Sequence, residues 1–241
     1  MRHIKIYTGN WRSIRSNQKH EIYTFNLNHW LGAMWLWEKT AKRMSPWKAA
    51  KLQTLIRLTK LDCQTITASI KQYYNDYQRY PTRKEQKANT DGSDLTYNSE
   101  AASNSDAIVI LMANSQLSDV NQAHRRNPKN IRYFDPKMVE GQNSHGVGSD
   151  GIFRDPWGNP YIITVDFNGN NKCFDFFYGN PVVSGNGTDR LGHYGLLREA
   201  INEKEQFYLP GTVMVWSKGP DRKADPTINA QKDVYRDNVV G

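Results

Sequence analysis

The sequence predicts an α+β fold, with one long amphipathic helix packed on a small antiparallel β-sheet. Two observations predict it. Apolar residues recur with a helical period over residues 46–79, and short runs rich in β-branched and aromatic residues follow within residues 155–241. A helix followed by consecutive strands is typical of the α+β class. With 241 residues, of which 38% are hydrophobic, the chain can bury a sizeable core, and a disordered chain is excluded.

The helix over residues 46–79 is predicted by a stripe of side chains at steps of three and four. Pro46 is tolerated in its first turn, and Tyr80-Pro81 ends it because the residue before a proline leaves the α region. We expect the later members of the stripe to contact the sheet. The earlier members should stay free or meet other subunits, because a helix of this length extends past a small sheet. The stripe consists of Leu52, Leu55, Thr59, Cys63, Ile66, Ile70, Tyr73 and Tyr77.

Residues 82–154 are predicted to form a variable region made mostly of loops. Residues 82–105 are polar, and Ser105-Asp106 can cap a short apolar helix over residues 107–114. Scattered glycines together with Asn-Pro and Asp-Pro pairs indicate a loop over residues 115–154.

Residues 155–241 are predicted to hold the β-sheet and a C-terminal loop. The Asn168-Gly169 pair lies between two β-rich runs, which predicts a hairpin. These runs are residues 161–166 and 172–178. The remaining expectations are a loop over residues 179–190, a short inserted helix over 196–206, a third strand over 212–216 and a loop over 217–241.

The net charge of +8 comes from the N-terminal quarter. Residues 1–60 hold 12 Lys and Arg against only Glu21 and Glu38, whereas the rest of the chain is slightly acidic. Residues 1–40 also carry four of the seven Trp residues with no clear period. This predicts an atypical basic, Trp-rich, poorly ordered segment in front of a domain of residues 41–241. Alternatively, such a segment binds nucleic acid or an acidic surface through charge and stacking.

Neither a membrane span nor a disulfide framework is visible in the sequence. The longest uncharged stretch, residues 22–37, is too short and too polar to span a membrane, and it lacks the cleavage site of a secretory signal. Cys63 and Cys173 are too few for a disulfide scaffold or a Cys-rich zinc module. We expect both to be buried as small hydrophobes, and whether they pair stays open.

The catalytic and cofactor motifs lack their required context. Gly146-x-Gly148-x-x-Gly151 matches the dinucleotide fingerprint, yet no predicted strand precedes it and no helix follows. Asp166-x-Asn168-x-Asn170 resembles the start of a calcium loop, but a hairpin turn explains it better, since the required Gly and Glu positions hold other residues. The six histidines are dispersed and no nucleophile signature occurs. We therefore predict that the protein is not an enzyme, with an unrecognised hydrolase as an alternative.

One acidic cluster lies in the C-terminal loop. Asp221, Asp225, Asp233 and Asp237 fall within about seventeen residues that contain few apolar side chains. A hard cation with oxygen ligands would neutralise the repulsion between these carboxylates and tie the loop down. The neighbouring Lys and Arg side chains could neutralise a solvated loop equally well, so both interpretations stay open at this point.

Four motifs make the chain resemble a known family from about Ala41 to the C-terminus. They are Ile70-Lys-Gln-Tyr-Tyr-Asn-Asp-Tyr-Gln-Arg-Tyr-Pro-Thr82, Asp155-Pro-Trp-Gly-Asn-Pro-Tyr161, Val213-Met-Val-Trp-Ser-Lys-Gly-Pro-Asp221 and Asp237-Asn-Val239. Together, in this order, they resemble the major pseudopilins of type II secretion systems, the G-type subunits. The resemblance implies a pilin-like fold and a structural subunit of a secretion pseudopilus. Such a filament subunit serves protein secretion by polymerisation rather than by catalysis.

The resemblance also implies partners, a location and a metal ion. The partners are other pseudopilin subunits and secretion-system proteins, without specific nucleic acid. The location is the periplasmic face of the inner membrane, with a hydrophobic N-terminal helix as the anchor. The family's calcium site lies in the loop after the last strand, which carries over to Ser217, Asp221, Asp233 and Asp237. The family often has Gly where this chain has Arg222.

In that family the mature chain begins at a Phe that follows a cleaved leader. Counting back from Tyr80-Pro81 by the family's helix length reaches Phe25, but Asn26, Asn28 and His29 stand where aliphatic residues are expected. We interpret residues 1–40 as the product of a shifted reading frame or a wrong start ahead of an intact domain. Without an anchor, the chain is expected to be soluble.

Overall fold

A computed structural model describes residues 45–83, 94–97, 102–141, 143–185, 191–201, 204–230 and 238–241. The chain divides into two units, Met1–Lys48 and Ala49–Gly241. The predictions for residues 1–40 lie outside the described residues. The second unit combines helices with antiparallel sheets, which confirms the predicted α+β class.

A long helix, α2, spans Pro46–Tyr77, close to the predicted 46–79. Pro46 occupies its first turn, where no backbone donor is missed. Gln78 then turns the chain in the left-handed region, with a φ of 53°, ahead of Tyr80-Pro81. The buried face of α2 consists of Thr59, Cys63, Ile66, Ser69, Ile70 and Tyr73. Earlier stripe members such as Leu52 and Leu55 are only half-buried, so the packed half is the C-terminal one, as expected.

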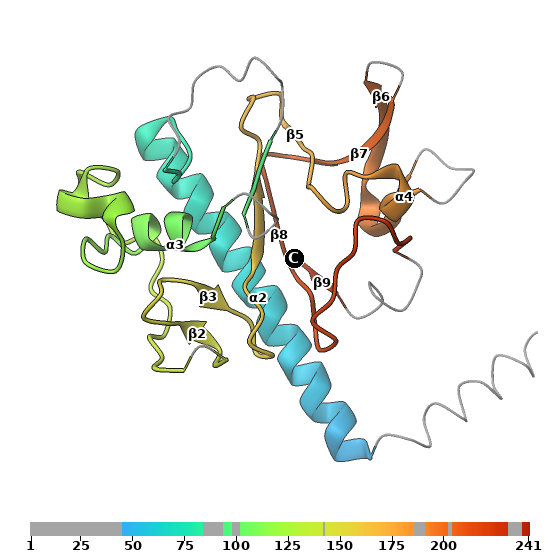
Figure 1. Cartoon of the computed structure of the whole chain (residues 1–241), viewed down its shortest axis with the longest axis horizontal. Coiled ribbons are helices and arrows are strands. Elements are labelled where there is room, and N and C mark those ends of the chain that lie inside the picture. Colours follow the sequence, from blue (N-terminus) through green and yellow to red (C-terminus); the bar gives the residue numbers. More distant parts are fainter. Residues whose placement is uncertain are drawn as a thin grey trace, which may run out of the picture. The chain divides into compact units, whose positions relative to one another are not determined.

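The main sheet has the strand order β1-β4-β8-β9, all antiparallel, and it separates two hydrophobic clusters. Its strands are β1 (Leu95–Tyr97), β4 (Ile162–Val165), β8 (Val213–Ser217) and β9 (Val239–Val240). Ile163 and Val215 face each other and pack with Ile66 and Ile70 of α2. Their alternate neighbours, including Trp216, point into the second cluster on the other side. Figure 1 shows α2 along one side of these strands, with β6, β7 and α4 on the other.

The remaining elements are short. Two smaller sheets occur: a β2–β3 hairpin and a three-stranded sheet in the order β5-β7-β6. The elements not yet given are α3 (Ser105–Leu111), η1 (Asp119–His124), β2 (Gly146–Val147), β3 (Phe153–Arg154), β5 (Lys172–Cys173), α4 (Pro181–Ser184), η2 (His193–Gly195), β6 (Leu197–Ile201) and β7 (Lys204–Pro210).

The predicted hairpin at Asn168-Gly169 is wrong. The strand before it, β4, pairs with β1 and β8, whereas the strand after it, β5, pairs with β7. The cause is the Asp166 carboxylate, which accepts hydrogen bonds from the backbone N–H groups of Gly169, Asn170 and Asn171. This side chain closes the turn in place of a strand ladder. The calcium-loop-like spacing of Asp166, Asn168 and Asn170 therefore has a local structural explanation.

The predicted helix over residues 196–206 is also wrong, because these residues form most of the β6–β7 hairpin. The register pairs Leu197 with Tyr208 and Glu199 with Gln206. Leu196 and Phe207 are buried in the second cluster. Burial of these two side chains and pairing with β5 outweigh the helix propensity of this Glu-rich segment.

Three stretches predicted as loop contain short elements. Residues 115–154 hold η1 and the β2–β3 hairpin, with Gly146 at the start of β2; residues 179–190 hold α4; and β9 ends the chain beside β8. The short helix α3 begins at Ser105, but Asn104 is its N-cap and makes no capping bond. The Asn104 side chain instead bonds backbone groups of Phe153 and Tyr161, which joins α3 to the strands.

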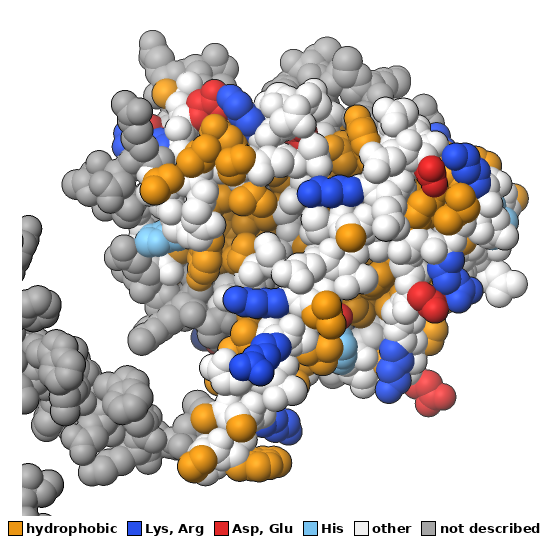
Figure 2. Space-filling view, turned by 180° about the vertical axis from the view of Figure 1, so that it is seen from behind, with side chains coloured by type: hydrophobic (Ala, Val, Ile, Leu, Met, Phe, Trp, Pro, Cys, Tyr) orange, Lys and Arg blue, Asp and Glu red, His pale blue; other side chains and the backbone are white. Residues whose placement is uncertain are grey.

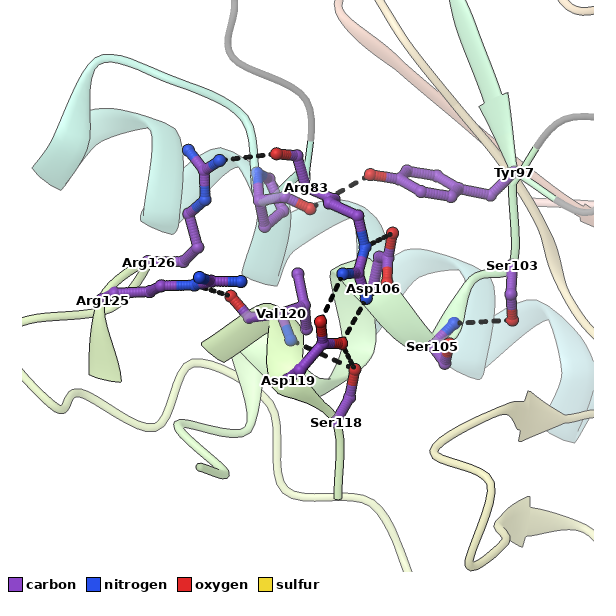
Figure 3. Close-up of polar contacts among 11 residues, drawn as sticks. Arg83, Tyr97, Ser103, Ser105, Asp106, Ser118, Asp119, Val120, Arg125 and Arg126 are labelled. Carbon is purple, nitrogen blue, oxygen red and sulfur yellow. Dashed lines mark hydrogen bonds and ion pairs between the residues drawn. The ribbon is translucent and has the colours of Figure 1, made fainter. Parts of the chain in front are cut away.

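Arg83 joins separate segments of the variable region 82–154 to one another (Figure 3). Its guanidinium pairs with Asp106 of α3 at 3.2 Å and with Asp119 of η1 at 2.8 Å. The hydrogen bond from Arg83 lowers the pKa of Asp119 to about 2. Arg126 donates to the Arg83 carbonyl at 2.5 Å, and Tyr97 donates to the Pro81 carbonyl at 3.2 Å. The exposed ion pairs add little stability, whereas the buried Tyr97 fixes where the region starts.

A pH dependence is expected from Asp94, which precedes β1. Its carboxylate accepts hydrogen bonds from the backbone N–H of Phe167 and of Phe174, and burial, aided by the nearby Asp166, raises its pKa to about 6. Because the folded pKa exceeds the ordinary 3.8, the stability that this group contributes is present at low pH and is lost as the pH rises through 6. Asp94→Asn should therefore reduce the gain in unfolding free energy between pH 7 and pH 5 by about 1 kcal/mol. Urea melts of both proteins at the two pH values measure this. An unchanged difference would contradict it.

Candidate functional site

The predicted cation-site residues lie at the end of β8 and in the loop that follows. Ser217 is fully buried; its hydroxyl donates to Asp155 and accepts from the backbone N–H of Gly219 at 3.0 Å. Asp221 is half-exposed and accepts from the backbone N–H of Lys223 at 2.8 Å. Asp233 and Asp237 lie outside the described residues. Of the predicted site residues, Ser217 thus contacts Asp155, and Asp221 contacts the backbone two residues further along the same loop.

Asp155 is the centre of this region, and sequence analysis missed it as a partner of Ser217. Its Oδ1 accepts from the backbone N–H of Trp157 at 2.9 Å and of Asn159 at 2.8 Å, which closes the Asp-Pro-Trp-Gly-Asn turn. Its Oδ2 accepts from the Asn159 side chain at 2.8 Å and from Ser217. The Asn159 amide also donates to the Gly219 carbonyl at 2.8 Å. We call Asp155, Asn159, Ser217 and Gly219 the Asp155 network.

The Asp155 network is buried and closely packed. Burial raises the pKa of Asp155, while its hydrogen bonds from Ser217 and Asn159 oppose that shift. Gly158 turns the chain with a φ of 87°, and a side chain there would approach the Asn143 carbonyl to 2.9 Å. The segment therefore needs glycine at this position. The network joins two segments that are sixty residues apart, the turn after β3 and the loop after β8.

The loop after β8 has hydrophobic anchors, contrary to expectation. Ala230 is buried, and Ala224 and Ile228 pack beside it against the second cluster. The loop is also tied to α4, because the Ala230 N–H donates to the Val183 carbonyl at 2.8 Å and the Asn229 side chain donates to the Gly185 carbonyl at 2.7 Å. The small size of Ala224 and Ala230 explains why composition did not indicate these contacts.

Asn238, directly before β9, carries an unsatisfied oxygen. The residue is 9% exposed, and its side-chain nitrogen donates to the Tyr178 hydroxyl at 2.9 Å. Within the part of the chain that the structure describes, its buried Oδ1 accepts no hydrogen bond. An orphaned acceptor is costly, and a hard cation or a water would satisfy it. Its position after Asp237 was the only sequence signal.

The described residues contain no cluster of side chains typical of a metal site. No three His, Cys, Asp or Glu side chains among them come together in a way that could hold a metal ion. Since two of the four predicted positions lie outside these ranges, the cation site depends on Asp221 and on neighbours that are not described.

A group of polar contacts around Asp62 links α2 to the sheet. Its Oδ2 accepts from the buried Tyr161 hydroxyl at 2.7 Å and contacts His145 Nε2 at 2.8 Å. The adjacent Cys63 is fully buried, and burial raises the pKa of its thiol, as it does for Cys173. Both thiols are free, and neither is the thiolate that nucleophilic catalysis requires. The contacts of Asp62 fasten three segments together.

The described helices include none that is both long enough and apolar enough to cross a membrane. No protein-family model matches the chain, and no curated protein or solved structure matches it.

Proposed function

We propose that the chain is a structural subunit of a type II secretion pseudopilus, of the major G-type, with a pilin-like fold. The observation that carries this proposal is the Asp155 network. It joins the Asp155–Tyr161 motif to the motif that ends at Asp221, so two separate points of resemblance meet in one buried cluster. The first motif leads into β4 and the second contains β8, and the helix that carries a third motif packs against these two strands.

The helix α2 supports a role in assembly. Its C-terminal half is buried against the sheet, while its N-terminal half presents apolar side chains outward: Trp47 is 71% exposed and Leu61 is 58% exposed. Exposed apolar side chains on this half of the helix, which lie among exposed Lys and Arg residues, fit packing against neighbouring subunits. In this proposal those subunits and the secretion proteins are the partners, at the periplasmic face of the inner membrane.

The surface charge does not favour the nucleic-acid alternative. On the face in Figure 2, Lys and Arg side chains are spread among apolar and neutral ones, not gathered into one patch. Nonspecific binding to nucleic acid needs clustered basic side chains along a phosphate path. The basic segment of residues 1–40 lies outside the described residues.

The loop conformation at Arg222 is a further support. Arg222 has a φ of 63°, in the left-handed region, where a side chain is strained and glycine is favoured. This is the position at which the resembled family often has Gly. The loop thus keeps a glycine-type conformation although its sequence has departed from glycine.

In this proposal a calcium ion is held by Asp221, Asp233, Asp237 and a carbonyl near Ser217. The orphaned Oδ1 of Asn238 fits the same donor chemistry, since all of these are hard oxygens. The ion would supply positive charge among the carboxylates and fix the C-terminal loop. Neither cysteine is near in sequence, so calcium suits these donors better than zinc.

Calcium is expected to stabilise the protein through this loop. When free calcium is a hundredfold above its dissociation constant, mass action adds about 2.7 kcal/mol to the free energy of unfolding. Asp221→Ala should remove most of this gain, whereas Asp91→Ala, far away in sequence, should leave it intact. Thermal melts in millimolar calcium and in excess chelator measure the effect. Identical melts of the unaltered chain in both conditions would reject the cation site.

Assembly tests the function itself. Residues 1–40 are replaced by the hydrophobic N-terminal segment of a major pseudopilin, and the chimera is produced with a type II machinery that lacks its own major subunit. We expect filaments in electron micrographs and restored secretion. Leu61→Asp should abolish both without changing the melting temperature. Leu191→Asp, at a leucine of similar exposure (54%) next to β6, should abolish neither. A folded chimera that forms no filaments would overturn the proposal.

A further inference from the structure

The turn after β4 carries an Asn-Gly pair in an unusual polar setting. Gly169 is exposed, has a φ of 77°, and no neighbouring atom lies within 4 Å of where a Cβ would be. Asn168, one residue earlier, is half-exposed. The Asn-Gly pair is therefore at the surface, with open space beside Gly169.

Four hydrogen bonds surround this peptide, and three of them end on the Asp166 carboxylate. The Gly169 N–H donates to Asp166 Oδ1 at 2.8 Å. The Asn170 N–H lies 3.1 Å from the side-chain oxygen of Asn168 and 3.1 Å from Asp166 Oδ1. The Asn171 N–H donates to Asp166 Oδ2 at 2.7 Å, and Asp166 is only 1% exposed, so its carboxylate is held in place.

We propose that Asn168 is a site of self-catalysed deamidation, in which Asp166 is the base and the Asn170 N–H stabilises the oxyanion. The Gly169 nitrogen is the nucleophile, since its proton already points to a carboxylate. The Asn168 carboxamide is the electrophile, since its oxygen already accepts a backbone donor. These are the three roles that acyl transfer needs: a base, a nucleophile and a donor at the developing oxyanion.

The chemistry balances without any outside reagent except water. As Asp166 takes the proton from the Gly169 nitrogen, that nitrogen bonds to the Asn168 side-chain carbon, and the oxyanion forms beside the Asn170 N–H. The proton then passes to the side-chain nitrogen, the bond between this nitrogen and carbon breaks, and ammonia leaves. The product is a succinimide ring. Water opens the ring at either carbonyl and leaves aspartate or isoaspartate at position 168.

The modification would change the turn. Either product adds a carboxylate close in sequence to Asp166, and the Asp94 carboxylate already binds the N–H of Phe167, which lies between these positions. Isoaspartate also adds one methylene to the backbone within the segment that Asp166 closes. The hydrogen bonds from Gly169, Asn170 and Asn171 depend on this spacing, so the link between β4 and β5 should loosen.

The test compares two Asn-Gly pairs in the full chain. Asn168-Gly169 and Asn186-Gly187 are incubated together in the folded protein and in urea, and peptide mapping by mass spectrometry measures aspartate and isoaspartate at each. In urea both should react at similar rates. In the folded protein, Asn168 should react about tenfold faster than in urea or more, because general-base catalysis contributes at least that much. A rate at Asn168 that is equal or slower in the folded state would overturn the proposal.

A pH profile and two variants identify the base. In urea the rate should rise in proportion to hydroxide, whereas in the folded chain, where Asp166 supplies the base, it should rise much less steeply with pH. Asp166→Asn should return the rate at Asn168 to the urea value, and Asp150→Asn, which removes a carboxylate that pairs with Arg154 outside this turn, should not. If Asp166→Asn does not fold, the profile of the unaltered chain decides. A hydroxide-proportional rate in the folded state would exclude Asp166 as the base.

Discussion

Asp155→Ala is expected to lower the free energy of unfolding by about 3–4 kcal/mol, because it leaves several buried donors without an acceptor. The substitution removes both acceptor oxygens of the Asp155 network at once. The N–H groups of Trp157 and Asn159 lose their partner, and so does the buried Ser217 hydroxyl. Hydrogen bonds to a charged group each contribute about 1.5–3 kcal/mol, although the losses within one network do not add fully.

Urea denaturation at constant pH measures this loss, with an unchanged slope as the sign that both proteins unfold from comparable states. The matched control is Asp150→Ala. Asp150 also accepts from a backbone N–H and pairs with Arg154 at 2.6 Å, but its side chain is 27% exposed. Its partner Arg154 is only 8% exposed but keeps a hydrogen bond to the Ile152 carbonyl, so removal of Asp150 should cost about 2 kcal/mol, less than removal of Asp155. A loss below 1 kcal/mol for Asp155→Ala would show that the two segments are held together by other contacts.

The long helix could be predicted because its signals are local. The spacing of Cys63, Ile66, Ile70 and Tyr73 is that of one buried helix face, and the proline after Tyr80 marks its end without reference to the rest of the chain. The third strand, β8, could be predicted for a similar reason, since Val213, Val215 and Trp216 have strong β propensity, and all five of its residues are buried.

The β6–β7 hairpin could not be predicted, because the forces that form it act over a distance. Residues 196–206 contain Leu, Glu, Ala and Lys, which favour a helix when considered alone. Phe207 is buried against residues of α4 and β8, and β7 gains its other partner from β5, more than thirty residues earlier. Both the burial of Phe207 and the pairing of β7 with β5 involve residues distant in sequence, so a short stretch of sequence does not indicate them.

The Asn168-Gly169 turn was misjudged for a different reason. Its dipeptide is a strong hairpin signal when the flanking strands decide the turn. Here the side chain of Asp166 supplies the acceptor that a strand partner would otherwise provide, and β4 is already paired on both edges. Whether a side chain or a neighbouring strand accepts the backbone hydrogen bonds of a turn depends on three-dimensional geometry, which the spacing of residues in the sequence does not reveal.

The candidate site could be predicted only in part. The resemblance indicated Ser217, but its partner Asp155 lies 62 residues away, and nothing local relates the two. Asn238 became a candidate only because the fold buries its oxygen without a donor from the described residues. Sequence patterns identify residue types suited to a cation. Only the packed structure shows whether each buried polar atom has a hydrogen-bond partner.

Trp216→Ala is expected to lower the free energy of unfolding by about 4–5 kcal/mol, because Trp216 is the largest fully buried side chain among the residues that the structure describes. It packs edge-on against Phe177 and Tyr178, with ring centroids 5.4 and 4.9 Å away. Its indole N–H donates to Asp175 at 3.0 Å. Alanine would leave a cavity in the second cluster and remove a donor from a buried carboxylate.

Two further variants separate these effects and test the architecture. Trp216→Phe keeps an aromatic ring but removes the donor, so it should cost about 2 kcal/mol. Trp47→Ala removes the same side chain from the exposed part of α2 and should change the unfolding free energy by about 0.5 kcal/mol or less. Urea melts of all three provide the comparison. The second cluster holds β8 against α4 and the β6–β7 hairpin, so near-native stability of Trp216→Ala would mean that this side of the sheet is not a packed core. The Asp155 network would then lack the rigid strand end on which Ser217 depends.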